Sequence, residues 1–198
     1  MTLILGSSSP RRREMLDMIG IAYTACTPPF DERAFVHSGD AYELAKLLAE
    51  EKCASLVGEF PNEPILCADT LVVLDNEVYG KPDDASHAFE MLKKLSGRTH
   101  KVLTGVAIRQ DAKVVSGVAQ TDVTIKTLTD DQIRAFHKAI NPLDKAGAYA
   151  AQGIGALILE RINGAYDNVV GLPMQLVMEL LKQMEIDIWD YVLSLSSS

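Results

Sequence analysis

The sequence predicts an α/β protein in which helices flank a mixed β-sheet. Short apolar runs of strand length alternate with longer amphipathic segments of helix length. Two pairs of these runs are joined by very short turns, which predicts antiparallel hairpins within the sheet. Of the 198 residues, 47% are hydrophobic and 23% charged, which suffices for a real core. We therefore expect one domain over residues 1–195 and a disordered tail at 196–198.

The first third of the chain predicts a strand, a helix, a loop and a second helix. Residues 3–5 form a short buried strand, and Ser9 then caps a helix whose first position, Pro10, needs no N–H. This helix runs to Gly20. Prolines predict an extended loop over 23–40, and apolar spacing predicts a helix over 40–57. The residues expected on the buried faces are Met15, Leu16 and Ile19 in the first helix and Leu44, Leu47, Leu48 and Ala54 in the second.

The remaining elements follow from apolar runs and turn residues. Residues 65–74 are apolar enough for a buried strand, and Asp75-Asn76 predicts a tight turn into 78–79. The other expected elements are a helix capped by Asp83 or Asp84 and ending at 95–97, a hairpin of 100–108 and 113–126, a helix over 130–140, a strand over 156–162 and a helix over 173–184. The segment 142–153 shows no clear pattern.

Charge and cysteine content exclude several classes of protein. A net charge of −8 and a pI near 5.0 argue against a general nucleic-acid binder. Cys26, Cys53 and Cys67 form no C-x-x-C pair, so neither a disulfide framework nor a zinc site is expected. The apolar runs fall short of a membrane span. We expect a cytoplasmic protein that binds neither nucleic acid nor membranes.

The segment 7–13, Ser-Ser-Ser-Pro-Arg-Arg-Arg, has the composition of a phosphate-binding turn. Hydroxyls and the N–H groups of a helix N-terminus suit an anion, and arginine can hold two phosphate oxygens at once. The alternative is a capped helix with a solvated basic first turn. Cations there oppose the helix dipole, however, so three successive arginines favour a bound anion. Ser7, Ser9, Arg11 and Arg12 are therefore candidate phosphate-binding residues.

Charged residues elsewhere provide candidates for the chemistry of such a site. Asp69 interrupts an apolar strand, so it is either a carboxylate satisfied locally or a functional group, which means a metal ligand or a base toward water. Glu32 on the long loop offers a second hard oxygen ligand, which favours the functional interpretation. Lys52 and Lys81 read alone as solvated lysines. Together with the arginines they supply enough positive charge for a triphosphate.

The segment 144–155 is rich in small residues, which serve either close approach to a ligand or tight packing. Gln152 within it carries an amide that can pair with the edge of a base. His37, His87, His100 and His137 lack a metal-binding spacing and are interpreted as surface or core-edge residues.

Several segments in a fixed order resemble the Maf family, nucleoside triphosphate pyrophosphatases first linked to septum formation. The similarity spans nearly the whole chain. It is carried by Ser7-Ser8-Ser9-Pro10-Arg11-Arg12, Ala68-Asp69-Thr70, Gly80-Lys81-Pro82, Leu95-Ser96-Gly97-Arg98-Thr99-His100, Asp144-Lys145-Ala146-Gly147-Ala148-Tyr149 and Asn168-Val169-Val170-Gly171-Leu172-Pro173.

The resemblance implies two lobes around a cleft, a fold shared with inosine triphosphate pyrophosphatases, and a homodimer. It also implies cleavage of a nucleoside triphosphate between the α and β phosphates with Mg²⁺ or Mn²⁺. By position, Asp69 matches the proton acceptor, and Ser7, Arg12, Glu32, Lys52 and Lys81 match phosphate and metal positions. Arg11, Thr70 and Gln152 match residues tied to base choice.

The resemblance extends to substrate preference. Ala68-Asp69-Thr70 is similar to the branch that prefers dTTP and UTP, rather than the Ser-Asp-Gln of the 7-methylguanosine triphosphate branch. A house-cleaning role on these and modified pyrimidine nucleotides, linked to cell-division arrest, would follow. The rival interpretation is a non-catalytic nucleotide sensor or partner-binding regulator of septum formation. One departure from the family is Gly6, where many members have alanine, and little effect is expected from it.

Overall fold

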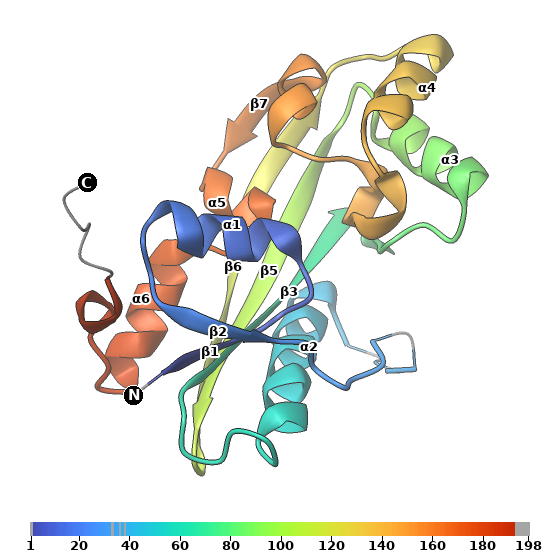
Figure 1. The fold of residues 1–198 in the computed structure, drawn as a ribbon. Coiled ribbons are helices and arrows are strands. Elements are labelled where there is room, and N and C mark those ends of the chain that lie inside the picture. The colour runs from blue at the N-terminus through green and yellow to red at the C-terminus, as the bar shows by residue number, and fades with distance from the viewer. Residues whose placement is uncertain (1, 33, 36, 38, 193–198) are drawn as a thin grey trace, which may run out of the picture. The chain divides into compact units, whose positions relative to one another are not determined.

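The computed structural model describes residues 2–32, 34, 35, 37 and 39–192, so the expected tail at 196–198 lies outside the described residues. The α/β class is confirmed: among the described residues, helices flank one seven-stranded mixed sheet (Figure 1). Its strands are β1 (Leu3–Gly6), β2 (Tyr23–Cys26), β3 (Ile65–Leu74), β4 (Glu77–Tyr79), β5 (Thr99–Gln110), β6 (Lys113–Ile125) and β7 (Leu159–Asn163).

The hydrogen-bonded order of the strands is β2-β1-β3-β5-β6-β7, and β4 pairs with β3. Strand β1 is parallel to both β2 and β3, whereas the β3–β4 and β6–β7 pairs are antiparallel. The turn between β3 and β4 is the predicted one, with positive φ at Asp75 and Asn76. The mixture of parallel and antiparallel pairs is what the alternation of crossover helices and tight turns predicts.

The helices connect these strands and cover the sheet. They are α1 (Pro10–Met18), α2 (Ala41–Leu56), α3 (Ala85–Leu95), α4 (Asp130–Ala139), α5 (Tyr166–Val170) and α6 (Met174–Gln183). Short 3-10 helices occupy η1 (Pro142–Asp144), η2 (Ala146–Ala148), η3 (Gly153–Leu157) and η4 (Ile188–Tyr191). Asp40, Asp84 and Thr129 cap α2, α3 and α4 by accepting a backbone N–H, as short polar side chains do at helix starts.

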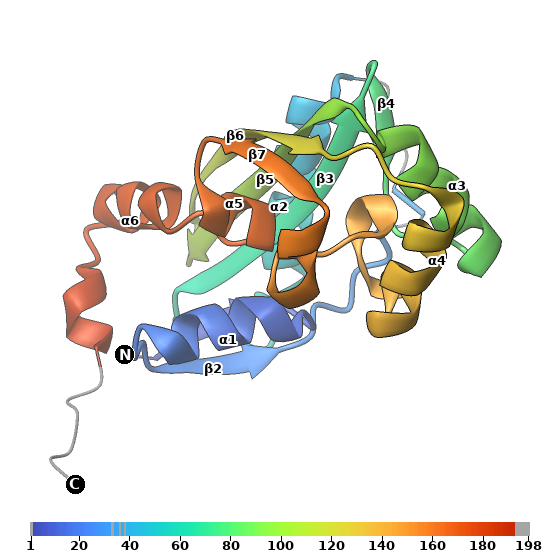
Figure 2. The same ribbon diagram turned by 90° about the horizontal axis from the view of Figure 1, so that it is seen from above.

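The chain divides into two compact units. The first takes residues 1–69, 104–119 and 171–198, as far as they are described, and the second takes 70–103 and 120–170. In the first unit, α2 packs against a core that includes Ile4, Cys53, Ile65 and Ala107. In the second unit α3 and α4 lie side by side, as Figures 1 and 2 both show, over a larger apolar core. Each unit thus has its own hydrophobic core.

Several details differ from the sequence-based expectation. The segment 23–40 is not all loop, because Tyr23–Cys26 pairs with β1 as an edge strand. Ile19, expected to be buried, is 48% exposed, since α1 ends at Met18. The buried face of α2 is rotated from the predicted one and consists of Ala45, Leu48, Ala49, Lys52, Cys53 and Leu56. The periodicity of apolar residues does not predict a lysine on the buried face of a helix.

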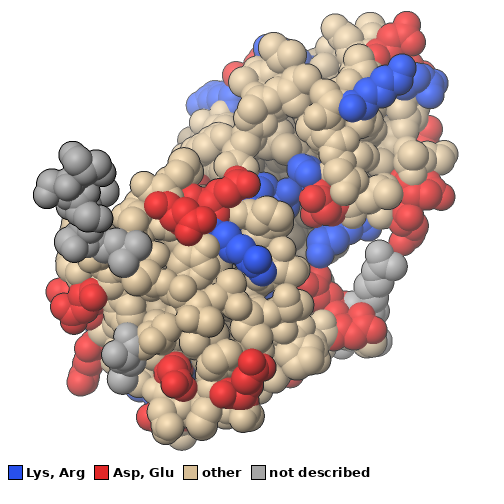
Figure 3. All heavy atoms as spheres, in the orientation of Figure 1, with Lys and Arg blue, Asp and Glu red and all other residues tan. Residues whose placement is uncertain are grey.

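The later part of the chain holds elements that the sequence does not suggest, namely α5, η4 and the 3-10 helices η1 and η2 in the segment without a clear pattern. The strand expected over 156–162 starts only at Leu159, because residues 153–157 form a 3-10 helix. Within the described ranges, none of the helices combines the length and apolarity that crossing a bilayer requires. Figure 3 shows acidic and basic side chains together on one face, so the net negative charge does not make that face uniformly acidic.

Candidate active site

The turn from β1 into α1 places Ser7 at the end of a buried strand. Ser7 is 3% exposed, and its Oγ accepts the backbone N–H of Ser9 at 3.1 Å. Pro10 stands at the first position of α1, as predicted. The Ser7 N–H donates to the carbonyl of Cys26 on β2 at 2.8 Å. The turn is therefore fixed on both sides, with the N-terminus of a helix behind it.

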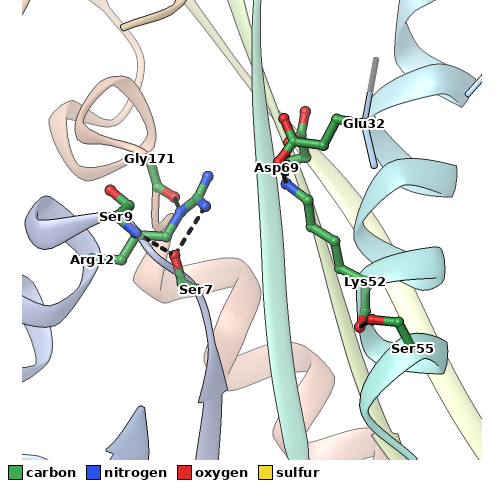
Figure 4. A network of polar contacts seen from close by, with 8 residues as sticks. All are labelled: Ser7, Ser9, Arg12, Glu32, Lys52, Ser55, Asp69 and Gly171. Atoms are coloured by element: carbon green, nitrogen blue, oxygen red, sulfur yellow. Dashed lines mark hydrogen bonds and ion pairs between the residues drawn. The ribbon is translucent and has the colours of Figure 1, made fainter. Parts of the chain in front are cut away.

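Arg12 is a buried cation beside this turn (Figure 4). Its Nε donates to the Gly171 carbonyl at 2.6 Å, and its Nη1 lies 3.4 Å from Ser7 Oγ. Arg13 turns back in a similar way, with Nη2 donating to the Ser7 carbonyl at 3.0 Å. Burial lowers the pKa of Arg12, and the carboxylate of Asp69 counteracts that shift. The guanidinium is thus held in place by neutral acceptors and retains positive charge for an anionic ligand.

Lys52, Asp69 and Glu32 form a second polar group in the same unit (Figure 4). Lys52 Nζ lies 2.5 Å from Asp69 Oδ1 and 2.7 Å from Glu32 Oε1. The side chains of Lys52 and Asp69 are 7% and 9% exposed, whereas that of Glu32 is 38% exposed. The ammonium therefore bridges a buried carboxylate on β3 and a partly exposed one on the loop before α2.

Burial dominates the electrostatics of Asp69. Its pKa is raised by loss of hydration, and the Lys52 ammonium opposes this by favouring the charged form. Glu32 adds a further upward contribution because two carboxylates repel, while Arg12 acts in the opposite direction. A carboxylate whose pKa lies above its ordinary value is a stronger proton acceptor once ionised, which suits a general base.

The strand register explains why the Ser7 turn and Asp69 lie near each other. Gly6 of β1 lies opposite Cys67 of β3, and Ser7 and Asp69 follow that pair on adjacent parallel strands. A Cβ at position 6 would lie 2.3 Å from Cys67 Sγ and 2.8 Å from Leu56 Cδ1. From the sequence we expect alanine and glycine to be nearly equivalent at position 6, but an alanine side chain would overlap the Cys67 thiol next to the Ser7 turn.

The carboxylates fit the predicted divalent metal in number and chemistry. Asp69 and Glu32 converge on one cation, the Lys52 ammonium, and carboxylate oxygens are the ligands that Mg²⁺ and Mn²⁺ prefer. Among the described residues, no group of three or more His, Cys, Asp or Glu side chains is arranged to hold a metal ion. Two carboxylates still suffice for Mg²⁺ when substrate phosphates and waters complete its shell.

The other predicted residues belong to the second unit. Thr70 follows Asp69 on β3, exposed Lys81 follows β4, and half-buried Gln152 precedes η3. The turn that carries Lys81 is tied to η2, because the Gly147 N–H donates to the Gly80 carbonyl at 3.1 Å. The structure thus brings Ser7, Ser9, Arg12, Glu32, Lys52 and Asp69 together in the first unit, along with half-buried Arg11 on α1.

Two contributions to the site were not predicted from the sequence. Gly171 holds Arg12 through its backbone carbonyl, and a carbonyl has no residue-type signal. Gly105 on β5 contacts α2 so closely that a Cβ there would overlap the carbonyl of Ala45. Gly171 stands in one of the segments that carry the family resemblance, whereas the contact of Gly105 depends on two elements far apart in the sequence.

The sequence of this chain is similar to known proteins along nearly its whole length. A family model described as Maf-like protein matches residues 2–184. A dTTP/UTP pyrophosphatase of Moorella thermoacetica is 45% identical over 192 residues, which cover 96% of this chain and 98% of that one. A dTTP/UTP pyrophosphatase of Escherichia coli is 41% identical over 180 residues, or 91% of both chains. The solved structure of the Staphylococcus aureus Ham1 protein matches with a TM-score of 0.48 at 14% identity, covering 97% and 94% of the two chains.

Proposed function

We propose, because the chain belongs to the Maf family, that it is a nucleoside triphosphate pyrophosphatase acting on dTTP and UTP. The reaction is hydrolysis between the α and β phosphates, giving a nucleoside monophosphate and pyrophosphate. The observation that carries the proposal is the buried Lys52–Asp69 pair, with Glu32 on the same ammonium and Arg12 beside it. Such a concentration of charge in a core-forming strand and helix is costly and is typical of a catalytic centre.

Asp69 is the proposed proton acceptor. Its carboxylate would orient a water toward the α-phosphorus and take the proton as the O–P bond forms. The raised pKa of Asp69 increases its basicity, and the Lys52 ammonium keeps it ionised and in one orientation. Asp69 would therefore act as a base that is buried but remains charged.

The cations would stabilise the charge that develops on the phosphates. As the α–β bridge breaks, negative charge grows on the pyrophosphate leaving group, and Arg12, Lys52 and Lys81 are the proposed partners of that charge. The Ser7 turn, with Ser9 and Arg11, would bind the phosphate chain at the N-terminus of α1. By family position, Thr70 and Gln152 would contact the pyrimidine base.

Asp69 and Glu32 would hold the divalent metal together with substrate oxygens. When bound, Mg²⁺ or Mn²⁺ draws electron density from the phosphates and makes the α-phosphorus easier to attack. The carboxylates also support this part of the proposal on electrostatic grounds. The Lys52 ammonium balances only one of the two carboxylate charges, so a metal ion would remove the remaining repulsion between Asp69, Glu32 and a triphosphate.

The test is pyrophosphate release from dTTP, UTP, CTP, GTP and 7-methyl-GTP with Mg²⁺ or Mn²⁺. We expect dTTP and UTP to be preferred, and Asp69→Asn to lower kcat by roughly 10²–10⁴-fold, the usual contribution of a general base. Asp17→Asn is the matched control, because Asp17 is an exposed carboxylate on α1 whose contact is with the Tyr23 hydroxyl.

Binding measurements separate the possible outcomes. Asp69→Asn should still bind nucleotide by calorimetry, since the cations remain. Near-normal turnover in Asp69→Asn would refute its role as base. Nucleotide binding without pyrophosphate release by the unmodified protein would instead assign it to the class of nucleotide sensors.

A further inference from the structure

We infer that Gly105 is a positioning residue for the catalytic pair. Because it has no side chain, the backbone of α2 can rest directly on β5, and this contact sets how closely Lys52 approaches Asp69. The part of the inference that concerns turnover rests on the proposed function, whereas the part that concerns the position of Lys52 does not. All of the groups involved belong to the first unit.

The contact at Gly105 is between main chains. A Cβ at this position would lie 1.9 Å from the Ala45 carbonyl oxygen and 2.8 Å from the Lys46 nitrogen. Ordinary van der Waals contact of a Cβ begins at about 3.4 Å, so a methyl group would require a displacement of more than about 1 Å. No side-chain rotation can provide this space, because the opposing atoms belong to the helix backbone.

The displacement would fall on α2 rather than on the strand. Strand β5 has a hydrogen-bonded neighbour on each side, β3 and β6, and moving it would disturb both ladders. Helix α2 is held to the sheet by side-chain packing. Packing against a sheet adjusts by small shifts of the helix more readily than a strand leaves its ladder.

A second contact joins α2 to the sheet next to Lys52. The Cys53 thiol lies 3.4 Å from the carbonyl of Ala107 on β5 and 3.4 Å from that of Ile65 on β3. Ala45, Ala49 and Cys53 follow one another at intervals of four on the buried face, with Ala49 fully buried between the two contacts. One row of residues on the buried face of α2 is therefore made of small side chains, which lets this side of the helix lie close to the sheet.

The distance between α2 and the sheet sets the position of the Lys52 ammonium in the site. Lys52 lies seven residues, or about two helical turns, beyond Ala45 and so on the same face. Its Nζ lies 2.5 Å from Asp69 Oδ1 and 2.7 Å from Glu32 Oε1, so both contacts are short. A shift of α2 by about 1 Å would either lengthen these contacts beyond about 3.2 Å, where hydrogen bonds end, or force the Lys52 side chain into another rotamer.

The experiment compares Gly105→Ala with Gly117→Ala. Gly117 is also a strand glycine of the first unit, but the atoms nearest to a Cβ there belong to the Leu176 side chain, the closest being Cδ1 at 2.9 Å. Side chains of this kind can rotate away. The first readout is the rate at which an amine-reactive ester labels Lys52 in the folded protein, measured by peptide mass spectrometry. Lys46, whose side chain is 46% exposed, is the internal reference on the same helix.

We expect Gly105→Ala to raise the labelling rate of Lys52 relative to Lys46 by at least threefold, and Gly117→Ala to leave the ratio unchanged. The second readout is pyrophosphate release, for which kcat should fall by roughly 10²-fold in Gly105→Ala, the usual effect of about 1 Å of misplacement. KM should change much less. Adding Ala45→Gly should restore neither value, because the obstructing atom is a backbone oxygen.

Equal labelling ratios and equal kcat values in the two glycine variants would overturn the inference. If the unmodified protein releases no pyrophosphate, the proposed function fails, while the labelling ratio still decides whether Gly105 positions Lys52. If Gly105→Ala does not fold, Ala49→Val displaces α2 through a side chain instead. A folded Ala49→Val protein with the labelling ratio of the unmodified chain would also contradict the inference.

Discussion

The two units bury polar groups in opposite electrical states. In the first unit one buried pair is charged: Lys52 contacts Asp69, and the charge of Arg12 also acts on that carboxylate. In the second unit one buried pair is neutral: His100 Nε2 lies 2.7 Å from the Tyr149 hydroxyl, and both side chains are buried. Each unit has its own hydrophobic core. Burial alone therefore does not decide which form a polar group takes.

The pKa shifts show what decides it. Burial lowers the pKa of His100 to about 4 and raises that of Tyr149, so both are neutral at pH 7. Burial also raises the pKa of Asp69, but Lys52 and Arg12 oppose that shift and stabilise the carboxylate. The direct contact with Lys52 therefore opposes the effect of burial on Asp69, whereas the charge of Asp122 does not offset the effect of burial on His100. The comparison separates a group built for reaction from one that serves structure.

Removing the Lys52 ammonium should have the largest effect on the difference between the charged pair and the neutral pair. Lys52→Met should lower the free energy of unfolding by about 3–5 kcal/mol at neutral pH, because it leaves the buried Asp69 carboxylate without its closest cation. The pKa of Asp69 should then rise further. When the pKa of an acid is higher in the folded state, the folded state binds the proton more tightly than the unfolded state does. The loss of stability in Lys52→Met should therefore shrink as the pH falls toward the pKa of Asp69 in the unfolded chain.

Urea unfolding at pH 8 and pH 5 measures this effect, with Lys46→Met as the control. Lys46 lies on the same helix and pairs with Glu50 at 3.8 Å, but its side chain is 46% exposed. Its removal should cost less than about 1 kcal/mol at either pH. An equal loss for Lys52→Met at both values would show that Asp69 does not become the unpaired charge.

The charged centre also marks the limit of what the sequence predicts. The α/β class, the hairpin turns and the capped helices follow from local patterns, and Asp69 stands out in the sequence because it interrupts an apolar strand. Only the charge of Lys52 and the family resemblance indicate its role, since apolar periodicity assigns the buried face of a helix to hydrophobic residues. Its partner depends on the packing of α2 against β3, which sequence spacing does not encode. The same holds for the carbonyl of Gly171 and the contact at Gly105.

The neutral pair of the second unit can be tested through its titration. The unfolded chain protonates His100 near pH 6.5, but the folded protein does so only near pH 4. The unfolded state therefore binds more protons between these values, and stability should fall by up to about 3 kcal/mol as the pH drops through that window. His100→Gln should remove this part of the pH dependence.

Thermal or urea unfolding between pH 7 and pH 4 gives the required slopes. His87→Gln is the matched control, because His87 lies in the same unit on the exposed side of α3 and contacts Asp83 at 3.2 Å. That variant should keep the slope of the unmodified protein. If His100→Gln keeps it as well, the low pKa of His100 is not the source of the acid sensitivity.

The smallest effect is expected from two glycines, one in each unit, that share a backbone conformation with positive φ. Gly147 and Gly20 have φ of +67° and +68°, which costs about 1–2 kcal/mol for any residue with a Cβ. At Gly20 nothing lies within 4 Å of a Cβ, whereas at Gly147 the Cβ would lie 3.1 Å from Val72 and 3.2 Å from Leu95. Gly147→Ala should therefore lose about 1 kcal/mol more stability than Gly20→Ala, as overpacking adds to the backbone strain.

Gly147 also has a consequence for Lys81 that Gly20 lacks. Its N–H donates to the carbonyl of Gly80, the residue directly before Lys81. A shift of η2 should therefore move the Lys81 turn, and Gly147→Ala should lower pyrophosphate release more than its loss of stability explains. If the two glycine variants release pyrophosphate equally fast at a temperature where both are folded, the hydrogen bond between Gly147 and Gly80 does not affect the reaction. The second unit would then contribute Lys81 from a turn that tolerates displacement, unlike the Lys52–Asp69 pair of the first.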